Sequence, residues 1–449
     1  MILAVVFYSI IPCVHQYNIW RHRIKKIMKQ FSLSTWMKIP FLNLLIVSFI
    51  GIILRYKIAF ALPFVDQKFL LHAHSHFAFS GWLSQLLMAF IVQYMQNKKS
   101  DLNFKKYNVL LWVNLISAYG MLFSFPFQGY GAVSISFSTL SVFNAYVFAI
   151  IVWKDLNRLS LKSISHYWFK AAIIFNSVSS FGAFALGYTM ANKIASQEWY
   201  LAAVYFFLHF QYNGWFFFAA MGLFVEWLID NGIAINKSSS KKIFWLFFIA
   251  SIPAYFLSAL WLPVPSWLYV LIVASAVAQI IGFIILLKHI KNNIKGIKSI
   301  ISKPVKWLWT LSFIALGIKL LLQVGSTIPS LNMVAYGFRP IVIGYLHLVL
   351  LGMLSIFLIG YVIATRVVEY SSLLKRGLIL FITGIIINEI LLMLQGVYAM
   401  TYNNIASVNY LLLGAAIIMF TGLIFINRSV WQQTSTINFP SLSSAAIEQ

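Results

Sequence analysis

The chain consists mostly of long apolar segments that alternate with short polar ones. At a rise of about 1.5 Å per residue, most of these segments are long enough, as helices, to cross a hydrocarbon core of about 30 Å. Of the 449 residues, 61% are hydrophobic and 9% are charged, and a water-soluble core could not bury so much apolar surface. The sequence therefore predicts an all-α, polytopic integral membrane helical bundle of about 13 transmembrane helices. The thirteen segments lie at residues 1–19, 38–57, 69–95, 107–126, 131–153, 167–189, 198–229, 243–261, 267–288, 307–325, 340–365, 376–398 and 409–427.

The net charge of +24 follows this arrangement and does not indicate nucleic-acid binding. If the N-terminus lies outside, 27 of the 33 Lys and Arg residues fall in cytoplasmic loops, at inner helix ends or in the tail, and five fall on the opposite side. Cytoplasmic loops of membrane proteins carry such an excess of positive charge. We therefore expect the N-terminus outside, the C-terminus in the cytoplasm, and the lipid bilayer as the surrounding partner.

The pattern predicts three parts along the chain. Residues 1–37 form an N-terminal span and a basic cytoplasmic loop, residues 38–428 form the membrane domain, and residues 429–449 form a polar tail that we expect to be disordered. The single cysteine, Cys13, excludes an internal disulfide and the C-x-x-C-H signature of covalently attached haem.

Histidines stand out inside the apolar segments. The third segment begins with "LLHAHSHFAFSGW", which holds His72, His74 and His76. His209 and His347 lie in two other segments, at a similar depth from the outer side. Ionisable side chains are rare within membrane spans and call for a functional explanation. His72 and His76 are four residues apart and share a helix face, whereas His74 points elsewhere.

Three explanations fit these histidines. Each could hydrogen-bond to a neighbouring helix. Two imidazoles on facing helices could instead hold a haem iron from both sides. A zinc or copper site is a further alternative, because a histidine pair at i, i+4 also suits those metals. The agreement of three helices in histidine depth favours ligation of haem or metal over isolated hydrogen bonds.

The order of these helices resembles subunit I of the haem–copper oxidase superfamily, which includes the nitric oxide reductases. If segment 1–19 is an addition, the other twelve correspond to the twelve core helices of that family. His76, His209 and His347 then fall on the second, sixth and tenth core helices, which carry haem and metal ligands in the family.

Two short stretches add to the resemblance. "HFQYNGW", which begins at His209, is similar to the H-x-x-x-E-G pattern of nitric oxide reductases, with Asn213 in place of the glutamate. "YLHLVLLGM" is similar to the H-x-H-x-V-L-x-x-G segment, which places His347 at the second histidine, the low-spin haem ligand. The resemblance therefore implies a low-spin b-type haem held by His347 and, in order of expectation, His76, His72 or His74.

The chain also departs from the family pattern. Tyr345 replaces the ligand of the high-spin haem, and segment 243–261 lacks the adjacent His-His pair that binds copper. We therefore expect a modified or lost oxygen or nitric oxide reduction site near His209, Tyr212 and Tyr345, with His209 as a metal ligand. Tyrosine can ligate haem iron, so a second haem or metal stays open.

Arg55 and Arg339 are among the few cations expected on the outer side, and they flank the two candidate haem helices. Haem propionates lie toward this side in the family, so charge-assisted hydrogen bonds from these arginines to the propionates fit the pattern. Snorkelling of the arginines to the membrane surface is the alternative.

Together these features favour a respiratory-type electron-transfer haemoprotein of a bacterial inner (plasma) membrane, an oxidoreductase of the oxidase class if it is an enzyme. Its expected partners are haem, other respiratory-complex subunits and a cytochrome or quinol donor. A transporter or permease whose histidines line a proton or metal-ion path is the main alternative. A non-catalytic assembly factor with the same fold is a third.

Overall fold

The computed structural model describes residues 32–99, 102–160, 162–332, 338–400 and 406–433. Every regular element in these ranges is a helix, and the ranges contain no strand. Eleven helices are long and apolar enough to cross a membrane, and a bent pair could form a twelfth span. The prediction of an all-α polytopic membrane bundle is therefore confirmed. The predicted span at 1–19 lies outside the described residues.

The twelve predicted segments from 38–57 onwards each correspond to one helix or to one run of consecutive helices. The last helix continues to Gln432, four residues into the predicted tail. The elements are α2 (Leu33–Ala59), α3 (Gln67–Phe77), η1 (Ala78–Ser84), α4 (Gln85–Lys98), α5 (Phe104–Gln128), α6 (Ala132–Arg158), α7 (Ser165–Ala191), α8 (Gln197–His209), η2 (Phe210–Phe216), α9 (Phe217–Asp230), α10 (Lys237–Ser251), η3 (Pro253–Ala259), α11 (Ser266–Asn292), α12 (Ile294–Ile300), α13 (Lys303–Gly325), α15 (Arg339–His347), η4 (Leu348–Ser355), α16 (Ile356–Ala364), α17 (Ser372–Met400) and α18 (Ala406–Gln432).

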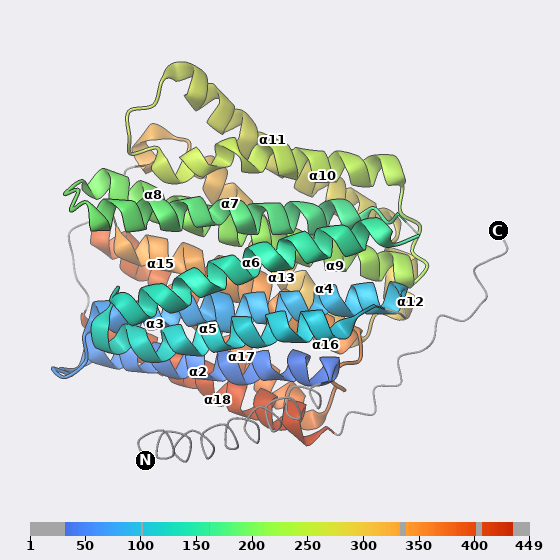
Figure 1. Ribbon diagram of the computed structural model, residues 1–449, viewed down its shortest axis with the longest axis horizontal. Helices are drawn as coiled ribbons and strands as arrows, with labels where there is room; N and C mark the ends of the chain where they lie inside the picture. The colour runs from blue at the N-terminus through green and yellow to red at the C-terminus, as the bar shows by residue number, and fades with distance from the viewer. Residues whose placement is uncertain (1–31, 100–101, 161, 333–337, 401–405, 434–449) are drawn as a thin grey trace, which may run out of the picture.

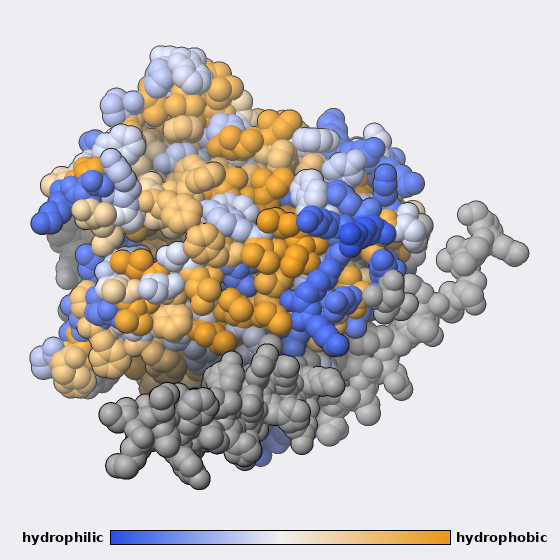
Figure 2. All heavy atoms as spheres, in the orientation of Figure 1, coloured by the Kyte–Doolittle hydropathy of each residue, from blue (hydrophilic) through white to orange (hydrophobic). Residues whose placement is uncertain are grey.

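Most of the helices lie side by side along one common direction (Figure 1). Apolar residues cover the middle of the visible face, and hydrophilic residues gather towards the ends of the helices, most densely at the right-hand end (Figure 2). An apolar band between two polar ends is the surface that a bilayer requires. The protein is therefore an integral membrane protein.

Three spans change from α-helical to π-helical geometry, and each does so within two residues of a histidine. His209 ends α8 before η2, His347 ends α15 before η4, and His76 lies two residues before η1. Single π-helical turns are rare inside α-helices and occur frequently at functional sites. The three spans that the sequence analysis singled out by their histidines are thus also distinct in backbone geometry.

The three π-helical segments meet in the bundle and are tied together by two hydrogen bonds. The indole Nε1 of Trp82 in η1 donates to Ser355 Oγ in η4 at 2.8 Å. The indole Nε1 of Trp215 in η2 donates to Ser84 Oγ in η1 at 3.0 Å. Both tryptophans are buried, and η2 also contacts η4. We call these four side chains the central junction, because they fix the three histidine-bearing spans against one another.

The predicted span 243–261 is bent. Helices α10 and η3 meet at an angle of 44°, and Pro253 begins η3. Proline has no N–H to donate and its ring disturbs the preceding helical turn, which is the usual cause of a kink. The bend leaves the backbone carbonyl of Ser251 available to a side chain from another span.

We expect Ser355→Ala to destabilise the fold by about 1–3 kcal/mol, because the buried Trp82 N–H would lose its acceptor. Thermal unfolding of the purified protein in detergent measures the change. Ser136→Ala is the matched control, since the exposed Ser136 bonds only within its own helix. Equal melting temperatures for the two variants would contradict the role of the central junction.

Candidate functional site

His74 and His347 share one hydrogen-bonding pattern. His74 Nδ1 lies 3.1 Å from the carbonyl oxygen of Val47 in α2, and His347 Nδ1 lies 2.8 Å from the carbonyl oxygen of Ile343. A ring nitrogen beside a carbonyl oxygen must carry the proton and donate it. In both residues the unprotonated nitrogen is therefore Nε2, whose lone pair is left for a ligand.

The structure also brings these two histidines together, although they come from different spans. The His74 imidazole is within electrostatic reach of His347, and both are within reach of the Arg55 guanidinium. Both rings are half-buried. Two imidazoles, each with Nε2 unprotonated, thus lie on spans that are close enough for their charges to interact.

Charged groups of the outer half surround this region unevenly. Arg55 in α2 is within electrostatic reach of Arg339 at the start of α15 and of Glu389 in α17. Glu389 accepts a hydrogen bond from Asn388 Nδ2 at 3.1 Å, which leaves it only partly available to Arg55. The two predicted arginines therefore lie in one cluster that is richer in positive than in negative charge.

His72 and His76 lie on another side of α3, against α5 and the turn that follows it. The His76 ring stacks on Phe125 with centroids 4.6 Å apart, and the His72 ring lies 4.6 Å from the ring of Tyr130. His76 Nε2 is 3.2 Å from the Tyr130 hydroxyl. The depth of His76 made it the first candidate partner of His347, but the side-chain geometry favours His74, because a histidine two residues away points to a different neighbour.

Tyr130 is held in the turn between α5 and α6. Gly129 adopts a positive φ of 56°, and an added Cβ would lie 2.4 Å from the Phe69 side chain of α3. The turn thus needs glycine and packs directly on α3. Burial raises the pKa of the Tyr130 phenol, so the phenol stays protonated while its hydroxyl shares a hydrogen bond with His76 Nε2.

His209 is engaged by hydrogen bonds at both ring nitrogens. Nε2 donates to the carbonyl oxygen of Ser251 at 2.8 Å, and Asn213 Nδ2 donates to Nδ1 at 3.1 Å. The Ser251 carbonyl is the one freed by the bend before Pro253. Neither ring nitrogen has a lone pair free for a metal, so the geometry does not favour the metal role expected for His209.

The other two residues expected at the second site do lie near His209. The rings of His209 and Tyr212 are 6.4 Å apart, and those of Tyr212 and Tyr345 are 6.1 Å apart. Tyr212 is buried and also interacts with Ser258 through its hydroxyl. Within the described ranges, no group of three or more His, Cys, Asp or Glu side chains is placed to hold a metal ion. The three residues are thus adjacent, but they form a hydrogen-bonded packing cluster.

Helices α15 and α8, which carry His347 and His209, are both only partly buried. None of the nine residues of α15 is fully buried, and in α8 only Ala203 and His209 are. His209 is thus enclosed by its neighbours, whereas His347 keeps part of its surface exposed.

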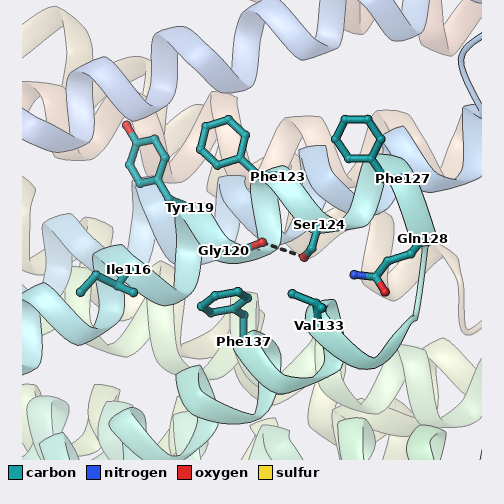
Figure 3. A pocket seen from close by; sticks show the side chains of 9 residues that line it. All are labelled: Ile116, Tyr119, Gly120, Phe123, Ser124, Phe127, Gln128, Val133 and Phe137. Atoms are coloured by element: carbon teal, nitrogen blue, oxygen red, sulfur yellow. Dashed lines mark hydrogen bonds between the residues drawn. The ribbon is translucent and has the colours of Figure 1, made fainter. Parts of the chain in front are cut away.

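A separate apolar groove of about 590 Å³ lies between α5 and α6 (Figure 3). None of its nine lining residues is charged; they are Ile116, Tyr119, Gly120, Phe123, Ser124, Phe127, Gln128, Val133 and Phe137. Phe123 and Phe127 are 66% and 86% exposed, whereas Phe125, which contacts the histidines, is fully buried. The groove therefore opens on the face of α5 that points away from the histidines.

The opposite, basic end of the bundle holds a polar cluster that the sequence analysis did not identify. Lys98 Nζ lies 2.7 Å from Glu226 Oε1 and 2.6 Å from Asp230 Oδ1, which joins α4 to α9. The Ser165 hydroxyl of α7 donates to Glu226 Oε2 at 2.6 Å. The residues lie far apart in the sequence. Their shared position at one end of their spans was the only indication in the sequence that they could meet.

No protein-family model matches the chain, and no curated protein is significantly similar to it in sequence. The function is therefore inferred from the geometry of the side chains.

We expect His209→Leu to destabilise the fold by about 1–3 kcal/mol, because the Ser251 carbonyl at the bend would lose its donor. His209→Gln should recover much of this stability, since the glutamine amide can also donate. Thermal unfolding of both variants tests the assignment. Equal losses for the two substitutions would show that the hydrogen bond to Ser251 is not what His209 provides.

Proposed function

We propose that the protein is a membrane haemoprotein that holds one low-spin b-type haem between His74 and His347 and acts in electron transfer. The observation that supports this most strongly is the shared pattern of the two rings, each with Nδ1 bound to a carbonyl and Nε2 free. Histidine ligands of metals commonly donate the other ring N–H to a carbonyl or carboxylate, which fixes the tautomer and makes the ligand more basic.

Three further features fit the needs of a haem. No residue of α15, the helix that carries His347, is fully buried. The cluster of Arg55 and Arg339 has an excess of positive charge, which suits the two propionates of a haem. The carbonyls of Val47 and Ile343 would keep the two imidazoles in one orientation. A bis-imidazole haem supplies one-electron transfer and has no open coordination position for a gas.

The resemblance to subunit I of the haem–copper oxidases supports the same proposal for fold and cofactor, but not for gas reduction. The His-His pair expected for copper is absent from segment 243–261, and His209 is committed to Ser251 and Asn213. We therefore propose an electron carrier with an oxidase-like helix order. Its setting would be a bacterial inner membrane with the N-terminus outside, and a cytochrome or quinol as donor.

We expect the purified protein to show sharp reduced-minus-oxidised absorption bands of a low-spin b-type haem. His74→Ala and His347→Ala should each abolish or broaden these bands, because one axial ligand is lost. His76→Ala is the matched control on the same helix and should keep them. Absorption spectra of the dithionite-reduced and oxidised forms provide the measurement.

Haem-free protein from haem-replete cells would overturn the proposal and favour the transporter alternative. If His76→Ala loses the bands and His74→Ala keeps them, the second haem ligand is His76, as its depth in the span predicted.

We expect the arginine cluster to set the midpoint potential. Arg55→Gln removes a positive charge that favours the reduced haem, so the potential should fall by tens of millivolts. For a one-electron couple, a change of 59 mV corresponds to a tenfold change in the equilibrium constant. Glu389→Gln removes a negative charge and should raise the potential. Redox titration followed by absorbance measures both, and shifts of the same sign would contradict the assignment.

A further inference from the structure

We propose that His72, His76 and Tyr130 form a second site, for a copper(II) ion, on the side of α3 that faces α5. This site uses none of the residues assigned to the haem. It goes beyond the proposed function, and each can be tested without the other.

The spacing of the two histidines suits one ion. Residues four apart on a helix lie on one face, with about 5–6 Å between their Cβ atoms. Two imidazoles at this spacing hold a single metal ion in helical metal-binding motifs. The contacts of both rings with Phe125 and Tyr130 show that they face the same neighbours.

His72 supplies an independent sign of a missing ligand. Its Nε2 atom is buried and has no hydrogen-bond partner among the described residues. A buried polar atom without a partner is costly, and such an atom in a native structure requires an explanation. Coordination of an ion would satisfy this nitrogen.

Tyr130 provides the third donor. Its hydroxyl is 3.2 Å from His76 Nε2, and its ring is 4.6 Å from that of His72. The glycine turn that packs on Phe69 fixes this tyrosine against α3. On metal binding, the phenol would release its proton to solvent, and the hydrogen bond to His76 would be replaced by two bonds to the ion. The charge of the ion offsets the burial that otherwise keeps the phenol protonated.

The donor set identifies the class of ion. Two imidazole nitrogens and one phenol oxygen suit copper(II), which prefers nitrogen and oxygen donors in tetragonal geometry. Magnesium and calcium prefer sites built from several oxygens, and this cluster offers one. The buried ring of Phe125 lies against both imidazoles and excludes water from one side of the site.

The test is titration of the chelator-treated, purified full chain in detergent with copper(II) alone. We expect one tightly bound ion per chain, an electron paramagnetic resonance spectrum with nitrogen hyperfine splitting, and a phenolate-to-copper absorption band. His72→Ala and His76→Ala should each weaken binding at least tenfold. Tyr130→Phe should remove the absorption band and keep the nitrogen splitting. His74→Ala, between the two ligands in sequence, is the matched control and should bind copper as the unmodified protein does.

Two results would overturn the proposal: unchanged copper binding in the His72→Ala/His76→Ala double variant, or binding that stays weak and unsaturated in the unmodified protein. Thermal unfolding of each variant reports whether it is folded, and the haem spectrum does so for the variants that keep His74. A protein without haem that still binds one copper through these residues would refute only the proposed function. A haem protein without copper binding would refute only this site.

Discussion

The arrangement of this bundle depends on the pairing of polar groups away from water. Indole N–H groups in the interior of a membrane protein have no water to bond to, so they must find acceptors on other helices. Trp82 and Trp215 do so at Ser355 and Ser84, and these two bonds connect all three π-helical segments. Because each π-helical segment adjoins a histidine, the same contacts set the relative depth of His76, His209 and His347.

Helix α3 carries histidines on two of its sides. Successive helical residues are rotated by about 100°, so His74 points away from the face that His72 and His76 share. One side meets α2 and the region of His347, and the other meets α5. A three-histidine cluster that looks redundant in the sequence is thus divided between two environments. This division explains why a single span can carry three imidazoles without their repelling or displacing one another.

Hydropathy predicted the spans well, because transfer of apolar residues into a bilayer is a local property of each segment. The common depth of the histidines was also visible in the sequence. The direction of each side chain around its helix was not, since it depends on which span becomes the neighbour. The partners of His209 show this limit: the Ser251 carbonyl is available only because of the bend before Pro253. Tyr130 was missed for a similar reason, since only the turn at Gly129 brings it to His76.

The charges of the outer half provide the last constraint. Arg55 lies near Arg339, near His74 and His347, and near the carboxylate of Glu389, which is itself bonded to Asn388. Charge inside a membrane protein is costly unless it is compensated, and exposure of Arg339 relieves only part of this excess. A proton or metal-ion path would not gain from a fixed positive cluster beside its histidines, because that cluster repels cations. A bound group with carboxylates would offset this excess, and for this reason we prefer the proposed haem to the transport alternative.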